Sequence, residues 1–112
     1  MNDQADLIIK ALKLAPLPLE GGFFNEIYRS ETMISPGECC GTSIYYLLRG
    51  NGISDWHMVS KDEIWYYHAG CPALQMLIFP NGSCKNLTIG PDVVNGHRPQ
   101  SVIPAGTWQS AK

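Results

Sequence analysis

The chain contains 112 residues, of which 45% are hydrophobic and 16% charged, and its formal net charge at pH 7 is −2. A chain of this length forms one domain with a modest core, and its eight basic residues are scattered, which argues against nucleic acid or an anionic membrane as a partner. No apolar run reaches the ~20 residues of a membrane span, and the N-terminus lacks the basic-then-apolar pattern of a signal peptide. We therefore expect a cytoplasmic protein.

The first expected element is a helix over residues 3–14. Its apolar residues, from Leu7 to Leu14, recur at helical spacing, Asp3 is a candidate N-cap, and Pro16 ends the pattern. After a turn at residues 20–22, aromatic and β-branched residues predict strands at 23–29 and 42–48, with a loop or a ragged strand edge at 30–40 between them.

Further strands are predicted in the second half of the chain, at residues 54–59, 63–69, 73–79, 84–89, 100–103 and 107–110. Strands 54–59 and 63–69 are expected to pair as antiparallel neighbours across the polar turn at 60–62. Short strands with regularly spaced turns predict an all-β antiparallel sandwich or barrel. We expect a single domain over residues 1–112, with a helix in 1–15 and a β-barrel in 20–112.

The four cysteines are expected to be reduced, because no secretory signal is visible and no CxxC spacing indicates a zinc site. Cys71 and Cys84 stand near the ends of a predicted hairpin and are candidates for proximity in space.

His57 and Glu63 are the leading candidates for chemistry. A neutral imidazole and a carboxylate that converge form either a metal half-site or an acid/base pair. A buried carboxylate is costly unless it is paired or ligated, so Glu63 needs a partner or a ligand. Gln109 follows the predicted turn at 104–106 and could meet both side chains, whereas His68 has the opposite strand parity to Glu63 and is expected to face outward.

Two spaced motifs resemble the signature of the cupin superfamily: Gly52-x4-His57-x5-Glu63-x6-Gly70 and Pro104-x-Gly106-x2-Gln109. More narrowly, the chain resembles the DUF985 or cupin-5 family through Gly21-Gly22-Phe23-Phe24, Glu26-x-Tyr28-Arg29-Ser30, the segment 42–48, Asp62-Glu63-Ile64-Trp65-x2-His68-Ala69-Gly70 and Pro104-Ala105-Gly106-x-Trp108-Gln109. The resemblance covers nearly the whole chain and implies an antiparallel double-stranded β-helix, the jelly-roll barrel of cupins, with one N-terminal helix.

The chain departs from the metal-binding cupin pattern, in which the first motif supplies His-x-His and Glu and the second another His. Here Val59 and Gln109 stand at two of the histidine positions, which leaves His57, Glu63 and Gln109 as the metal set. Zinc and iron usually keep at least three strong protein ligands. The expectation is therefore that no cofactor is required, with a divalent metal at these residues as the alternative.

A second departure is length, because members of the resembled family continue past the Trp-Gln pair for several tens of residues. Either the barrel lacks the usual C-terminal strands, or a second subunit covers its exposed edge, since uncovered edge strands promote aggregation. We expect a homodimer, as the resemblance also implies.

The resemblance implies a small polar metabolite in the barrel, such as a sugar, a sugar nucleotide or an organic acid. One hypothesis is a metal-independent epimerase or isomerase, with His57 as base, Glu63 orienting it and Tyr45 or Tyr67 as acid. In the same hypothesis Trp65 and Trp108 stack against the ligand, Tyr28 or Arg29 grips it, and the further binding residues are Ser43, His68 and Gln109. The alternatives are a binding module without turnover, a metal-dependent cupin enzyme, and a purely structural role in which aromatic residues fill the barrel and Arg29 pairs with Glu26 or Glu31.

Overall fold

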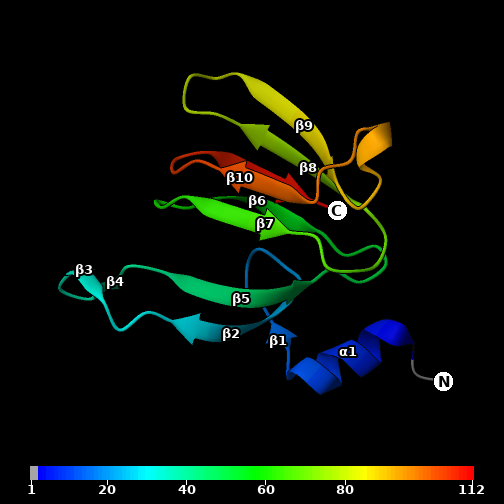
Figure 1. Ribbon diagram of the computed structural model, residues 1–112, viewed down its shortest axis with the longest axis horizontal. Helices are drawn as coiled ribbons and strands as arrows, with labels where there is room; N and C mark the ends of the chain where they lie inside the picture. Colours follow the sequence, from blue (N-terminus) through cyan, green and yellow to red (C-terminus); the bar gives the residue numbers. More distant parts are fainter. Residues whose placement is uncertain (1–2) are drawn as a thin grey trace. The chain divides into compact units, whose positions relative to one another are not determined.

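The computed structural model describes residues 3–112; residues 1 and 2, the start of the predicted N-terminal segment 1–15, lie outside the described residues (Figure 1). The all-β fold with an N-terminal helix is confirmed. The contacts divide the chain into two compact units, one ending at Gly52 and one beginning at Ile53. That residues 1–112 act as one domain stays a prediction. No helix among the described residues is long and apolar enough to cross a membrane.

The N-terminal unit begins with helix α1 (Gln4–Leu12), which Asp3 caps by accepting a hydrogen bond from the backbone N–H of Asp6 at 2.8 Å. That N–H, together with the Arg49 guanidinium, lowers the pKa of Asp3 from its ordinary value of 3.8. Arg49 forms ion pairs with Asp3 at 3.4 Å and Asp6 at 2.6 Å, and lies 5.9 Å from the ring centroid of Phe23. The first turn of the helix is thereby fastened to the strands of its own unit.

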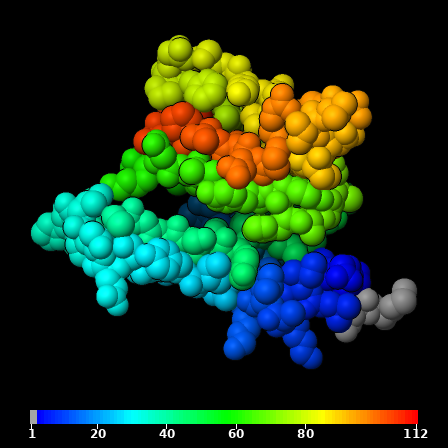
Figure 2. All heavy atoms as spheres, viewed as in Figure 1, coloured from blue at the N-terminus to red at the C-terminus, as the bar shows by residue number. Residues whose placement is uncertain are grey.

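A three-stranded antiparallel sheet in the order β1-β2-β5 forms the rest of the N-terminal unit, with β1 (Ala15–Pro16), β2 (Phe23–Arg29) and β5 (Thr42–Leu47). A small hairpin of β3 (Met33–Ser35) and β4 (Glu38–Cys39) occupies the region predicted as a loop or a ragged strand edge. In the space-filling view this hairpin (cyan) projects from the end of the β2–β5 pair that is remote from α1 (Figure 2).

The turn into β2 depends on Gly22, whose φ of +83° lies in the left-handed region. Tyr46 packs over this turn and donates a hydrogen bond from its hydroxyl to the Gly21 carbonyl at 2.5 Å. A Cβ on Gly22 would overlap with the Tyr46 phenol, so the position requires glycine for its backbone conformation and for its close contact.

The C-terminal unit contains two facing antiparallel sheets. The larger has the order β6-β11-β8-β9, with β6 (Ser54–Met58), β11 (Trp108–Ala111), β8 (Ala73–Ile78) and β9 (Cys84–Ile89). The smaller pairs β7 (Glu63–Tyr66) with β10 (Gln100–Ile103), and a 3-10 turn η1 (Val93–Asn95) precedes β10. The residues of β10 (orange) lie directly against those of β7 (green) in Figure 2.

The predicted pairing of strands 54–59 and 63–69 is wrong. β6 pairs with β11 and β7 pairs with β10, so the turn between β6 and β7 crosses from one sheet to the other. Hydrogen bonds to a distant turn hold this crossing: the Gly106 N–H donates to the Val59 carbonyl at 2.9 Å, and the Ala105 N–H donates to the Asp62 carboxylate at 2.8 Å. The loop at residues 60–62, which the sequence predicted as a hairpin turn, is therefore held by Ala105 and Gly106 of the second signature motif.

The described cysteines are free thiols. Cys84 pairs with Ile78 at the turn end of the β8–β9 hairpin, whereas Cys71 precedes Ala73, which pairs with Ile89 at the other end. Cys71 and Cys84 therefore lie at opposite ends of the hairpin and are not neighbours.

The two faces of the larger sheet differ in composition. The inner face, toward β7 and β10, contains the buried Leu77 and Ala111, but also buried polar residues such as Gln75 and Gln109, each 1% exposed. The outer face exposes a row of large apolar side chains on β6, β11 and β8: Trp56, Met58, Leu74, Met76, Ile78 and Trp108. We call these six residues the outer apolar face. A polar interior beside an apolar exterior reverses the usual distribution.

Candidate functional site

The inner faces of the two sheets bring His57, Glu63 and Gln109 into one region. Gln109 on β11 lies opposite His57 on β6 and opposite Leu77 on β8, so the three side chains share the inner face. From the smaller sheet, the Glu63 carboxylate accepts a hydrogen bond from the Gln109 amide, Nε2 to Oε2, at 3.4 Å. Gln109 thus connects the strand that carries His57 with the strand that carries Glu63.

Glu63 is also held within its own strand. The Trp65 indole N–H donates to Glu63 Oε1 at 2.5 Å, two positions along β7 and on the same face. Both carboxylate oxygens therefore accept a hydrogen bond, one from each sheet. The carboxylate is fixed in position as an acceptor in the half-buried interior.

The orientation of His57 is set by its own strand. Its Nδ1 lies 2.7 Å from the Asp55 carbonyl oxygen. A carbonyl only accepts hydrogen bonds, so Nδ1 carries the proton, and Nε2 is the unprotonated nitrogen when the ring is neutral. The partner that orients the ring at Nδ1 is a backbone carbonyl, whereas the sequence assigned the orienting role to Glu63.

Three buried polar atoms in this unit have no hydrogen-bond partner within the described part of the chain: Gln75 Nε2, Thr107 Oγ1 and Gln109 Oε1. Thr107, which is fully buried, precedes β11, and the two glutamines lie on the inner face of the larger sheet. An unsatisfied buried polar group costs about 1–3 kcal/mol. The interior therefore contains unsatisfied donors and acceptors that a polar guest would satisfy.

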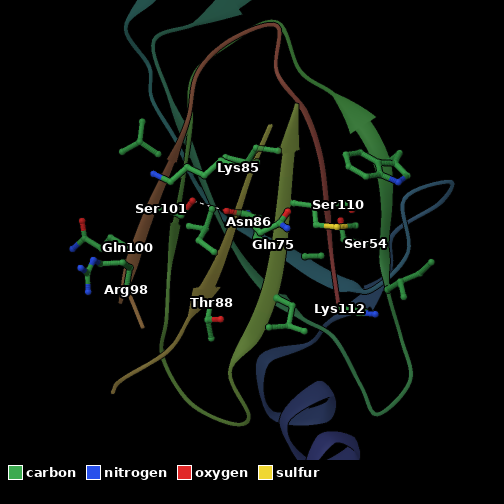
Figure 3. Close-up of a pocket in the computed structure, with 18 of the residues that line it drawn as sticks. Ser54, Gln75, Lys85, Asn86, Thr88, Arg98, Gln100, Ser101, Ser110 and Lys112 are labelled. Atoms are coloured by element: carbon green, nitrogen blue, oxygen red, sulfur yellow. Dashed lines mark hydrogen bonds between the residues drawn. The ribbon is translucent and has the colours of Figure 1, made fainter. Parts of the chain in front are cut away.

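A recess of about 1080 Å³ is lined by Gln75 and also by residues of the outer apolar face, Trp56, Leu74 and Met76 (Figure 3). Its polar lining includes Ser54, Gln75 and Ser101, and the hydroxyl of Ser101 on β10 donates to Gln75 Oε1 on β8 at 2.5 Å. His57, Glu63 and Gln109 do not line the recess. However, Gln75 is the diagonal cross-strand neighbour of Gln109, because both flank Leu77 in the register, and such neighbours lie about 7–8 Å apart.

The remaining candidates of this unit are Tyr67, His68 and Trp108. Tyr67 follows β7, is half-buried, and donates its hydroxyl proton to the Gly70 carbonyl at 2.7 Å. His68 is exposed, in line with its expected outward position. Trp108 pairs with Met58 and Ile78 on the outer apolar face and is 46% exposed, so its ring lies on the face opposite to Gln109.

The candidates of the N-terminal unit lie on β2 and β5. Tyr28 pairs with Ser43 and Asn25 with Tyr45, and the register shift between Glu26 and Tyr28 places all four side chains on one face. Arg29 instead forms a salt bridge with Glu26, Nη2 to Oε1 at 2.7 Å and Nε to Oε2 at 3.2 Å. This bidentate pair occupies the guanidinium that the sequence assigned to ligand binding, and it raises the pKa of Arg29.

A family model described as "Cupin superfamily (DUF985)" matches residues 6–112. The chain belongs to this family. Among solved structures, this cupin resembles a protein of Shewanella oneidensis, with 38% sequence identity and a TM-score of 0.90 over 100% of this chain and 70% of the other. It also resembles a hypothetical protein of Leishmania major, with 29% identity and a TM-score of 0.89 over 98% of this chain and 70% of the other. No curated protein matches.

Some cupins hold a metal at the positions of His57, Glu63 and Gln109, and the donors present here do not fit that role. Among the described residues, no three His, Cys, Asp or Glu side chains are grouped to hold a metal ion. One imidazole, one carboxylate and one amide fall short of the three strong ligands typical of zinc or iron sites. The carboxylate oxygens already accept hydrogen bonds from Trp65 and Gln109.

Sequence reasoning missed the residues of the recess, namely Ser54, Gln75 and Ser101. Gln75 interrupts the apolar strand Ala73–Ile78, and a glutamine in such a run was the available signal. Its inward parity only becomes visible through the pairing with Ala111 and the hydrogen bond to Ser101.

Proposed function

We propose that this cupin binds a small polar metabolite between the two sheets of its C-terminal unit. The observation that supports the proposal is the pair of buried glutamines, Gln75 and Gln109, each 1% exposed and each with one amide atom unpartnered within the described chain. A site that serves only as a core would satisfy such groups or replace them with apolar residues.

The geometry favours a guest with several hydrogen-bonding groups. Gln75 and Gln109 are diagonal neighbours on one face, and the Cα atoms of such neighbours lie about 7–8 Å apart. The Trp65 residue lies on the smaller sheet, opposite Ser101. A compact molecule with polar groups at its two ends, such as a sugar or an organic acid, would satisfy the Gln75 amide from the recess and reach the Gln109 amide by extending between the sheets past Leu77, because Gln109 itself does not line the recess. Neutral hydrocarbons would leave them unsatisfied.

Binding is tested by the melting temperature of the purified protein in the presence of monosaccharides, sugar nucleotides and organic acids, with mass spectrometry of any metabolite released on denaturation. A bound compound should raise the melting temperature of the wild type and leave Gln109→Leu unchanged. The matched control is Ile64→Leu, an exposed position on β7, which should respond like the wild type. An equal response of Gln109→Leu and wild type would contradict binding at this site.

One observation favours a second function, proton transfer in an isomerase or epimerase. The Asp55 carbonyl fixes the His57 tautomer, so that Nε2 is the basic nitrogen, as a general base requires. His57 would accept a proton from a carbon next to a carbonyl group, and Glu63 would stabilise the imidazolium that forms. Tyr67 donates its hydroxyl hydrogen bond to the Gly70 carbonyl, so the acid in this proposal is a Tyr67 whose hydroxyl has turned away from Gly70.

Proton transfer is tested by deuterium exchange into a compound that the binding screen identifies. Wild type should introduce deuterium from heavy water at one carbon. His57→Gln, which keeps a polar side chain but has no basic nitrogen, should bind the compound without exchange. Full exchange by His57→Gln would refute the role of the imidazole, whereas binding without exchange by the wild type would identify a binding module.

A further inference from the structure

Lys85 lies on the same inner face as the unsatisfied glutamines. It pairs with Leu77 in the β8–β9 register, next to Gln75, which pairs with Leu87. Gln75 and Lys85 are therefore diagonal cross-strand neighbours. Lys85 lines the recess, and within the described residues its ammonium group forms no ion pair or hydrogen bond. The side chain is exposed, so its ammonium group is accessible to an anion that enters the recess.

Gln75 and Ser101 supply hydrogen-bond donors beside this cation. With the Ser101 hydroxyl donating to Gln75 Oε1, both protons of Gln75 Nε2 lack an acceptor. If the amide is turned the other way, Nε2 donates to Ser101 and the Ser101 hydroxyl proton becomes available instead. In either orientation this buried pair, with Gln75 1% and Ser101 4% exposed, presents a proton without an acceptor.

The charged residues of the recess also favour an anionic ligand. Its charged lining residues are the basic Lys85, Arg98 and Lys112 and the acidic Asp55 (Figure 3). Lys112 pairs with Leu74 and therefore lies on the outer face, which leaves two basic residues and one acidic residue, in a protein whose net charge is −2. A local excess of positive charge within an acidic protein attracts anions. Buried donors beside a cation are the usual means of binding a carboxylate or phosphate oxygen.

We propose that Gln75, Ser101 and Lys85 form an anion subsite, which binds the carboxylate or phosphate group of the metabolite. This inference rests on the proposed function, because it makes the guest of the C-terminal unit an acid or a phosphate ester. The anionic group lies at Lys85 and Gln75, and the rest of the molecule extends toward Gln109. Gln75 and Lys85 are then specificity-determining residues that select anionic over neutral compounds.

In the test, inorganic phosphate or the neutral sugar D-glucose is added to the ¹⁵N-labelled full chain, and NMR measures the binding of each probe. Phosphate should shift the side-chain amide signal of Gln75, and Lys85→Gln should weaken its apparent affinity by about tenfold. Lys10→Gln removes the same charge from α1 and is the matched control. It should bind phosphate as the wild type does.

Each outcome decides a separate point. If the Gln75 amide does not move, or if Lys85→Gln and Lys10→Gln bind phosphate equally, the anion subsite is refuted. If D-glucose shifts the Gln109 amide while phosphate leaves Gln75 unmoved, the proposed function stands and the subsite fails. If phosphate shifts Gln75 and no compound of the binding screen reaches Gln109, the subsite stands and the wider proposal fails.

Discussion

Replacing Gln109 by leucine should separate the stability of this fold from its binding capacity. The amide is 1% exposed, its Oε1 is unpartnered in the described chain, and its Nε2 donates to Glu63 over 3.4 Å. Removing the unsatisfied oxygen recovers about 1–3 kcal/mol. Losing the long hydrogen bond to Glu63 costs about 1–2 kcal/mol, because Glu63 keeps Trp65 as a donor. The free energy of unfolding of the ligand-free protein should therefore fall by no more than about 1 kcal/mol, and it can rise by up to about 2 kcal/mol.

Urea denaturation followed by circular dichroism measures this change, provided that the slope with denaturant is the same in both proteins. Leu77→Ala is the reference, because Leu77 lies opposite Gln109 on β8 and is 2% exposed. Its truncation should lower the free energy of unfolding by about 2–5 kcal/mol. If Gln109→Leu destabilises the protein as much as Leu77→Ala does, the amide is a structural element of the fold, and its unsatisfied oxygen does not indicate a ligand.

Three further outcomes are expected. Gly22→Ala should lower the free energy of unfolding by about 1–3 kcal/mol through its positive φ and its overlap with Tyr46; a melting temperature equal to that of the wild type would contradict this. Asp3 has a lowered pKa in the folded state, so its stabilising effect is fully present above pH 3.8 and is lost as the pH falls through the lower folded-state pKa. The free energies of unfolding of wild type and Asp3→Asn, measured in an acid titration, should therefore converge below pH 3.8. A constant difference between the two curves would argue against the cap. We also expect the protein to self-associate through the outer apolar face, so that Trp108→Glu sediments as a smaller species than the wild type; identical sedimentation would exclude this face.

The local sequence sufficed for most elements of this protein. Asp3 and the apolar stripe that follows it specify α1, and alternating side chains with turn residues specify β2, β5 and β8 to β11 within one or two residues. These features depend on side-chain periodicity and on turn chemistry, which are properties of neighbouring residues. The spaced motifs around His57 and Gln109 likewise pointed to the cupin fold.

The tertiary structure alone decided which strands pair and which polar residues meet. β6 and β7 are adjacent in sequence, but long-range pairing with β11 and β10 outweighs the short turn between them. The same pairing faces Gln75 toward Ser101, 26 positions away, and aligns Lys85 beside Gln75. Alternation along a strand predicts that every second residue shares a face. Only the register with distant strands shows which of the two faces is buried. The candidate residues at His57 and Glu63 could be read from motifs, whereas the anion subsite required the register.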